Sequence, residues 1–96
     1  MYADQIIARV MVEMAEKELE IGFIKDISNR LHEYKQQGQD VSDVTLQRIP
    51  GGFYSKEVAE FVGRLLTVGL VTQENPIILN QEGIGWLKRM CKNETA

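Results

Sequence analysis

Apolar side chains recur at helical spacing in the first segment of the chain, residues 3–20. Successive members lie one or three positions apart, which gathers them on one face of a helix. The stripe consists of Ala3, Ile6, Ile7, Val10, Met11 and Met14. Gly22 interrupts the pattern, because glycine is a poor residue for a helix interior. The sequence therefore predicts a first helix over residues 3–20.

A second segment with helical spacing covers residues 24–37. Its apolar residues repeat at intervals of three, four and three, and they are Ile24, Ile27, Leu31 and Tyr34. Asp26 lies in the first turn, where the helix dipole favours an anion. Gly38 follows, and glycine readily adopts the left-handed conformation that ends a helix. We expect a second helix over residues 24–37.

The next segment fits two structures. Ser42 is able to cap a short helix over residues 43–49 that would bury Val44 or Leu46 with Ile49. The alternation in VTLQRI also fits a strand. The short helix is the favoured interpretation, and Pro50-Gly51-Gly52 forms a turn in either case.

The clearest helical pattern follows Ser55, which is a good N-cap residue. Its broad apolar stripe consists of Val58, Phe61, Val62, Leu65 and Leu66. Gly69 is placed just past the helix end, and Leu70 would then pack back on Leu65, a contact that accompanies this kind of C-cap.

Two short apolar runs after this helix predict a β-hairpin. Residues 70–73 and 77–79 form its strands, with Glu74-Asn75-Pro76 between them. Asn80 then caps a last helix that carries Ile84, Leu87 and Met90 or Cys91. The fold class is therefore mainly α with a small β-hairpin (α+β), in one domain over residues 1–96.

Composition restricts the classes of partner. The chain has 96 residues, 44% hydrophobic and 26% charged, with a net charge of −3. Residues 1–20 hold five acids and two bases, so they carry the whole net charge and the rest balances to zero. Nucleic-acid binding is therefore expected only through a local patch. No apolar run reaches the length of a membrane span, and the N-terminus lacks signal-peptide order, so we expect a cytoplasmic protein without a membrane partner.

Catalytic, metal and cofactor sites are not predicted. His32 is the single histidine and Cys91 the single cysteine, so a metal site would lack companion ligands. His32 is expected on the surface of the second helix, and Cys91 as an apolar residue. The glycines at 51–52 lack the following lysine of a phosphate-binding loop. We therefore expect that the protein is not an enzyme.

The order of these segments resembles winged helix-turn-helix domains of bacterial and archaeal regulators. A short helix, a turn, a longer helix ending in L-L-x-x-G-L-V, a hairpin and a closing helix follow one another. The matching segments are SDVTLQRI, PGGFY, SKEVAEFVGRLLTVGLV, TQENPIIL and NQEGIGWLKRM. The resemblance covers roughly residues 24–90. It implies a small transcription regulator that binds DNA.

The resemblance also implies which residues contact DNA. The helix 55–68 would lie in the major groove. Candidate contacts are Lys56, Glu60 and Arg64 on its exposed face, Tyr54 and Ser55 at its start, Arg48 before it, and the basic tail of Lys88, Arg89 and Lys92. For the exposed face, a solvated ladder of charges is an equally good interpretation. For Ser55, simple capping is the favoured interpretation, and Tyr54 fits packing as a hydrophobic staple equally well. The hairpin over residues 69–83 contains no lysine or arginine, so we do not expect it to contact phosphate.

The N-terminal helix, within residues 1–22, has two alternatives. In such regulators a helix added before the helix-turn-helix, wing and C-terminal helix (here residues 23–96) often pairs two subunits. Met11 and Met14 give this helix an adaptable apolar surface. It forms either a homodimer interface or a contact with its own domain. The alternative function is a winged-helix protein–protein interaction module that does not bind DNA and instead binds a protein partner.

Overall fold

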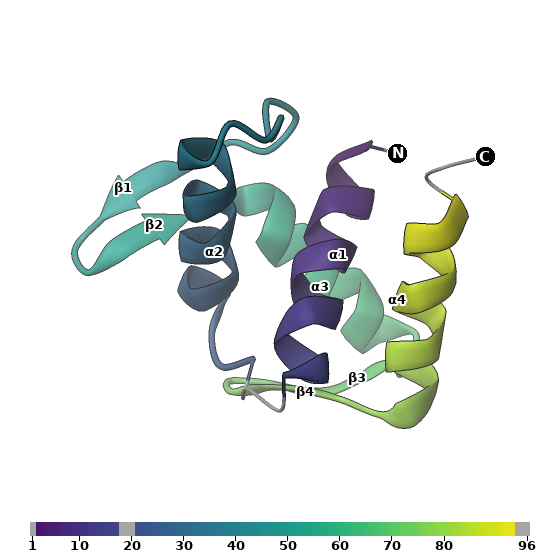
Figure 1. The fold of residues 1–96 in the computed structure, drawn as a ribbon. Helices are drawn as coiled ribbons and strands as arrows, with labels where there is room; N and C mark the ends of the chain where they lie inside the picture. The colour runs from purple at the N-terminus through teal and green to yellow at the C-terminus, as the bar shows by residue number, and fades with distance from the viewer. Residues whose placement is uncertain (1, 18–20, 94–96) are drawn as a thin grey trace.

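The computed structural model describes residues 2–17 and 21–93, where four helices and two antiparallel hairpins form a mixed α+β structure (Figure 1). The elements in chain order are α1 (Tyr2–Glu16), α2 (Ile24–Gln36), β1 (Gln47–Ile49), β2 (Gly52–Tyr54), α3 (Lys56–Thr67), β3 (Val71–Glu74), β4 (Ile77–Leu79) and α4 (Gln81–Asn93). Within the described residues, no helix is both long enough and apolar enough to cross a membrane.

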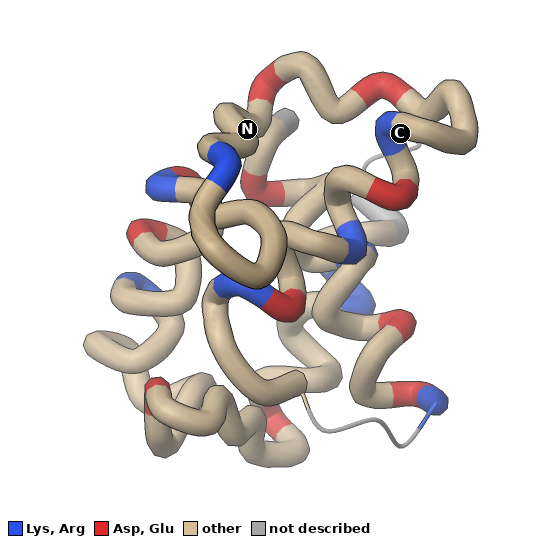
Figure 2. The backbone as a smooth tube through the Cα atoms, turned by 90° about the vertical axis from the view of Figure 1, so that its left-hand side faces the viewer, with Lys and Arg blue, Asp and Glu red and all other residues tan. Residues whose placement is uncertain are grey.

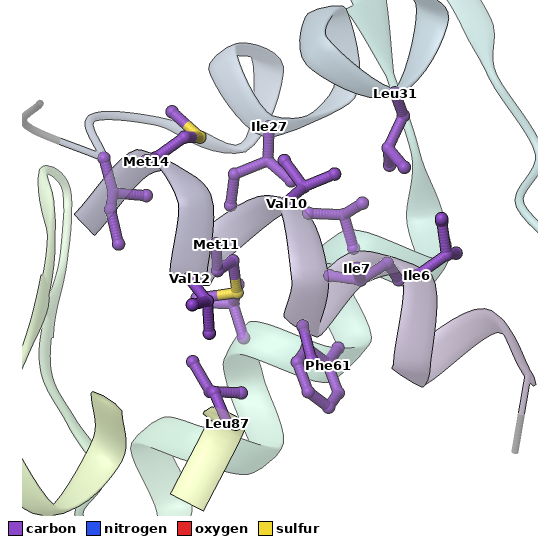
Figure 3. Packing of buried hydrophobic residues seen from close by; sticks show 14 of the residues in the cluster. Ile6, Ile7, Val10, Met11, Val12, Met14, Ile27, Leu31, Phe61 and Leu87 are labelled. Atoms are coloured by element: carbon purple, nitrogen blue, oxygen red, sulfur yellow. The ribbon is translucent and has the colours of Figure 1, made fainter. Parts of the chain in front are cut away.

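Helix α1 is the central element of the core. It lies between α2 and α4 and also packs on α3 (Figure 1). Its buried apolar residues are Ala3, Ile6, Ile7, Ala8, Val10, Met11, Val12 and Met14. They meet Ile27 and Leu31 of α2, Phe61 of α3 and Leu87 of α4 (Figure 3). The first helix is confirmed, with its end at Glu16; the predicted residues 18–20 lie outside the described part.

The apolar residues of this first helix contact its own domain. Met11 is fully buried and Met14 is 6% exposed, both within the single core cluster. These side chains fill the core, and the homodimer through the N-terminal helix stays a prediction. Methionine serves here as an adaptable core residue.

The short helix predicted for residues 43–49 is wrong, and the strand alternative holds for its second half. β1 pairs antiparallel with β2, with Ile49 opposite Gly52. Ser42 does not cap a helix, because its amide and its hydroxyl both donate to the Asp40 carboxylate, at 3.0 and 2.7 Å. Gly51 has φ +88°, which suits the turn after Pro50 rather than a continuing helix.

The β1–β2 hairpin is held against α2 by one aromatic residue. The Phe53 amide donates to Asn29 Oδ1 at 2.8 Å. The Phe53 ring stacks on His32 with centroids 4.0 Å apart, and the Arg48 guanidinium lies 5.2 Å from the ring centroid. His32 is therefore partly covered by the hairpin instead of standing free on the surface.

The second hairpin and the helices around it are present as expected, but β3 covers 71–74 instead of 70–73, and Leu66 of the predicted apolar stripe is 38% exposed. β3 pairs with β4, and the Ile77 amide donates to the Gly22 carbonyl at 2.6 Å in an isolated bridge. The Leu70 amide donates to the Leu65 carbonyl at 2.9 Å, which closes α3 at its predicted end. Asn80 caps α4, because its Oδ1 accepts the Gly83 amide at 2.7 Å. Local capping thus fixes the boundaries on both sides of this hairpin.

Tyr34 links α2 to α1 through its hydroxyl, which donates to the Glu13 carboxylate. Burial raises the pKa of the Tyr34 hydroxyl above its ordinary value, and the hydrogen bond and negative charge of Glu13 act in the same direction. The neutral phenol is therefore favoured in the folded state. Its contribution to stability is complete below the unfolded pKa of ~10 and is lost as the pH rises above it.

We expect Tyr34→Phe to lower the free energy of unfolding by about 1–3 kcal/mol at neutral pH, because Glu13 loses its donor. The difference between the two proteins should shrink as the pH rises above ~10. Urea unfolding at a series of pH values measures this. A difference that stays constant through the alkaline range would contradict the assignment of this pH dependence to Tyr34.

Candidate nucleic-acid interface

Ser55 serves as a structural cap at the start of α3. Its side chain is fully buried. Its Oγ accepts the Val58 amide at 3.4 Å and donates to the Glu57 carboxylate at 3.1 Å. The hydroxyl is therefore committed inside the fold, and the capping alternative for Ser55 is confirmed.

Lys56, Glu60 and Arg64, the charged residues predicted on one face of α3, do not all point to solvent without a partner. Lys56 and Glu60 are exposed, on the side away from the buried stripe of this helix. Arg64 turns aside: its Nη2 lies 2.9 Å from Asp4 Oδ1 in the first turn of α1, and its guanidinium lies 5.7 Å from the Phe61 ring centroid. Lys56 is therefore the basic residue that the exposed face of α3 presents at its start.

Tyr54 and Arg48 flank the entrance to α3 on the β1–β2 hairpin. Tyr54 is 37% exposed and lies opposite Gln47 in the register. Arg48 is exposed, faces Phe53 across the strands and covers its ring. Arg48 thus comes from a strand and not from a helix, but it remains close in sequence and in space to the start of α3.

Several cations of the described residues have a carboxylate partner. Arg64 pairs with Asp4, as described, and Lys88 Nζ lies 3.5 Å from Glu16 Oε2. Arg30 Nη1 lies 3.8 Å from Glu33 Oε1. These charges are largely balanced within the fold, although exposed pairs of this kind contribute little to stability.

Other cations lie around the β1–β2 hairpin, and we call Lys25, Arg48 and Lys56 the hairpin cations. None of the three has a carboxylate within ion-pair distance in the part of the chain that is described. The Lys25 ammonium lies beside the turn, 3.9 Å from the position that a Cβ on Gly51 would take. The hairpin cations therefore extend from the tip of the hairpin to the first turn of α3.

Two acids that are next in sequence to hairpin cations, Asp26 and Glu57, accept hydrogen bonds from backbone amides. Asp26 Oδ2 accepts the Phe23 amide at 2.7 Å, and Glu57 Oε1 accepts the Thr45 amide at 2.9 Å. Burial of Glu57 opposes its ionisation, but the hydrogen bonds from Thr45, from its own amide and from the Ser55 hydroxyl hold its pKa below the usual range. Figure 2 shows basic and acidic positions interspersed over this side, without a continuous basic band. The hairpin cations therefore differ from Arg30, Arg64 and Lys88 in lacking a carboxylate partner among the residues described, and not in forming a basic band.

Sequence reasoning missed Lys25 and the contacts below the hairpin. Lys25, Asn29 and His32 are spaced by four and three, which puts them on one face of α2. The sequence shows this spacing, but it does not show that Phe53 of the hairpin packs on this face. The predicted contribution of the basic tail is not supported, because α4 lies on the opposite side of the molecule from the hairpin (Figure 1). The side chain of Lys92 lies outside the described residues.

Within residues 2–17 and 21–93, no three His, Cys, Asp or Glu side chains come together in a way that could hold a metal ion. Cys91 is partly buried at the end of α4. Comparison of the chain with models of protein families, with curated proteins and with solved structures finds no match.

Proposed function

We propose that this chain is a winged-helix protein that binds duplex DNA through the start of α3 and the β1–β2 hairpin, as a small transcription regulator does. The observation that carries the proposal is that three cations without a carboxylate partner in the described residues lie together around the β1–β2 hairpin and the start of α3. Arg64, Lys88 and Arg30 have carboxylate partners, whereas the hairpin cations, defined above, have none. Unpaired cations on one side of α3 are the groups that neutralise phosphates.

The order of the elements supports the winged-helix interpretation. Helices α1, α2 and α3 are followed by the β3–β4 hairpin, and an isolated bridge from Gly22 to Ile77 ties the segment between α1 and α2 to β4. In this interpretation the first helix of the helix-turn-helix is α2, not residues 43–49. The β1–β2 hairpin then occupies the connection to α3, the recognition helix.

The proposed contacts differ from those expected of the wing. The β3–β4 hairpin has no lysine or arginine, so it neutralises no phosphate. Lys56 and the Tyr54 hydroxyl would contact phosphates or base edges at the start of α3, and Glu60 could accept from a cytosine amine. Lys25 and Arg48 would hold the backbone beside them. Ser55 and Arg64 are not among the proposed contacts, because Ser55 is buried as a helix cap and Arg64 pairs with Asp4.

The test is a titration of labelled duplex of mixed sequence at rising salt concentration. Each neutralised phosphate contributes a slope of about −0.9 in log K against log salt. The hairpin cations therefore predict a total slope of roughly −2 to −3. Absence of binding at low salt would overturn the proposed function, and binding that is insensitive to salt would overturn the role of these cations.

A protein-binding module is the second candidate function, and an apolar surface favours it. Leu66, Val68 and Trp86 are large hydrophobic residues with 38%, 68% and 38% of their surface exposed. Val68 and Trp86 line one pocket of about 500 Å³. Exposed apolar groups gathered around a hollow are typical of an interaction surface.

A further inference from the structure

Helix α4 presents a stripe of four residues on the side away from the core, and we call it the α4 stripe. Its members are Glu82, Gly85, Trp86 and Arg89. Leu87 is fully buried on the opposite side of the helix. Positions separated by three, one and three lie along one face. Within the described chain, neither Glu82 nor Arg89 has an ion-pair partner.

Trp86 separates two hollows in the surface. One, of about 370 Å³, is lined by the α4 stripe with Leu70 and Gln81. The other, of about 500 Å³, lies between Trp86 and α3, where Phe61, Leu65, Val68 and Leu70 line it. An exposed tryptophan beside apolar hollows is the kind of residue that dominates the binding energy of protein interfaces.

We propose that the α4 stripe is a homodimer interface, in which α4 packs antiparallel against α4 of a second copy. A two-fold axis midway between residues 85 and 86 pairs each position with the one equally far on the other side. Glu82 then faces Arg89 of the second copy, and the reciprocal pair forms as well. Trp86 faces Gly85 of the second copy. Such an interface is isologous, since one surface contacts its own equivalent.

Charge is the first argument that a second copy is the occupant. The α4 stripe carries an acid at one end and a base at the other. The surface that complements this pattern is the same stripe running in the opposite direction. Complementary charges of this kind mainly set the partner and its register. A parallel arrangement would place Glu82 against Glu82 and Arg89 against Arg89, which is unfavourable.

Gly85 is the second argument. A Cβ at this position would come no closer than 3.6 Å to another group, the end of the Arg89 side chain. Packing inside the monomer therefore does not require glycine here. Glycine in a helix interior nevertheless costs about 1 kcal/mol relative to alanine. In the antiparallel pair, the missing side chain leaves room for the indole of Trp86 from the second copy. This inference is independent of the proposed binding to DNA.

Self-association is tested first on the unmodified protein. Sedimentation equilibrium across a wide concentration range should show a monomer–dimer equilibrium. Trp86 is the single tryptophan, so its fluorescence emission should shift to the red on dilution as the indole becomes exposed to water. A protein that stays monomeric at every concentration would overturn the proposal. The α4 stripe would then be open to a different protein instead of a second copy.

The variant Gly85→Gln separates the interface from the fold. We expect it to weaken self-association by at least about tenfold, because the new side chain occupies the space for the indole. The monomer should be as stable as before or more stable, since glutamine is a better helix former than glycine. Unchanged self-association would place the interface elsewhere and overturn the proposal.

Charge exchange tests the antiparallel register. Glu82→Arg and Arg89→Glu should each weaken the homodimer, because like charges then meet twice. Mixing the two variants should yield a heterodimer, and both changes in one chain should restore the homodimer. If the two variants fail to associate when mixed, the register is wrong. If neither variant affects association, the stripe is not the interface.

Discussion

Replacing Lys56 by glutamate is expected to weaken binding to duplex DNA by about tenfold or more, which corresponds to at least ~1.4 kcal/mol. Lys56 is exposed at the first position of α3 and has no carboxylate partner in the described part of the chain. The substitution does not threaten the fold, because an acid in the first turn of a helix interacts favourably with its dipole. A loss of binding would therefore report on the surface itself.

Arg64 provides the contrast on the same helix. Its guanidinium is 2.9 Å from the Asp4 carboxylate, so we expect Arg64→Gln to change the affinity for DNA by less than Lys56→Gln. The salt slope should fall by about one for Lys56→Gln and stay unchanged for Arg64→Gln.

Lys88→Gln is the matched control for net charge. Lys88 lies on α4 beside Glu16, away from the hairpin. If Lys88→Gln weakened DNA binding as much as Lys56→Gln, the binding would depend on total charge and not on the hairpin cations.

Two glycines in α4 should respond in opposite ways to alanine. A Cβ at Gly83 would lie 2.5 Å from the Leu70 carbonyl oxygen and 3.1 Å from Leu79 Cδ2. That carbonyl is fixed in place, because it accepts the Asn80 amide at 3.2 Å. Gly83→Ala should therefore destabilise the protein by about 1–3 kcal/mol, despite the higher helix propensity of alanine. Gly85→Ala should instead stabilise the monomer by up to about 1 kcal/mol.

Urea unfolding at low protein concentration measures both effects without a contribution from association. The midpoint should fall for Gly83→Ala and rise for Gly85→Ala, with similar slopes. Equal shifts in one direction would show that helix propensity alone controls these positions. Such a result would contradict the close packing of α4 on the segment around Leu70.

Sequence patterns predicted the elements whose boundaries are set locally. Ser55 and Asn80 cap the helices that follow them, and Gly69 with φ +83° ends α3. Each depends on residues within a few positions, so the sequence contained the necessary information. The helix predicted for residues 43–49 was wrong because the structure of this segment depends on distant groups. Phe53 of the paired strand is held by Asn29, 24 positions away. No local pattern distinguishes that strand from a short helix.

In the candidate site, too, the sequence predicted what depends on local spacing and missed what depends on distant contacts. Periodicity placed Lys56 on the exposed face of α3, and this exposure is observed. It placed Arg64 there as well, but could not show that Asp4, 60 positions earlier in the chain, pairs with it. Lys25 was missed because its relation to the hairpin arises only when α2 and β2 pack together. A cation is available to a ligand only if no carboxylate from another part of the fold already pairs with it, and the sequence alone does not show such pairs.

The central position of α1 also has a consequence for how the protein folds. Among the described helices, α1 comes first in the chain, and α2, α3 and α4 all pack against it. Its apolar residues find Leu87 only after most of the described sequence has been synthesised. The core of the described residues therefore closes only when α4 is present, and we expect α1 to α4 to fold in a single cooperative event.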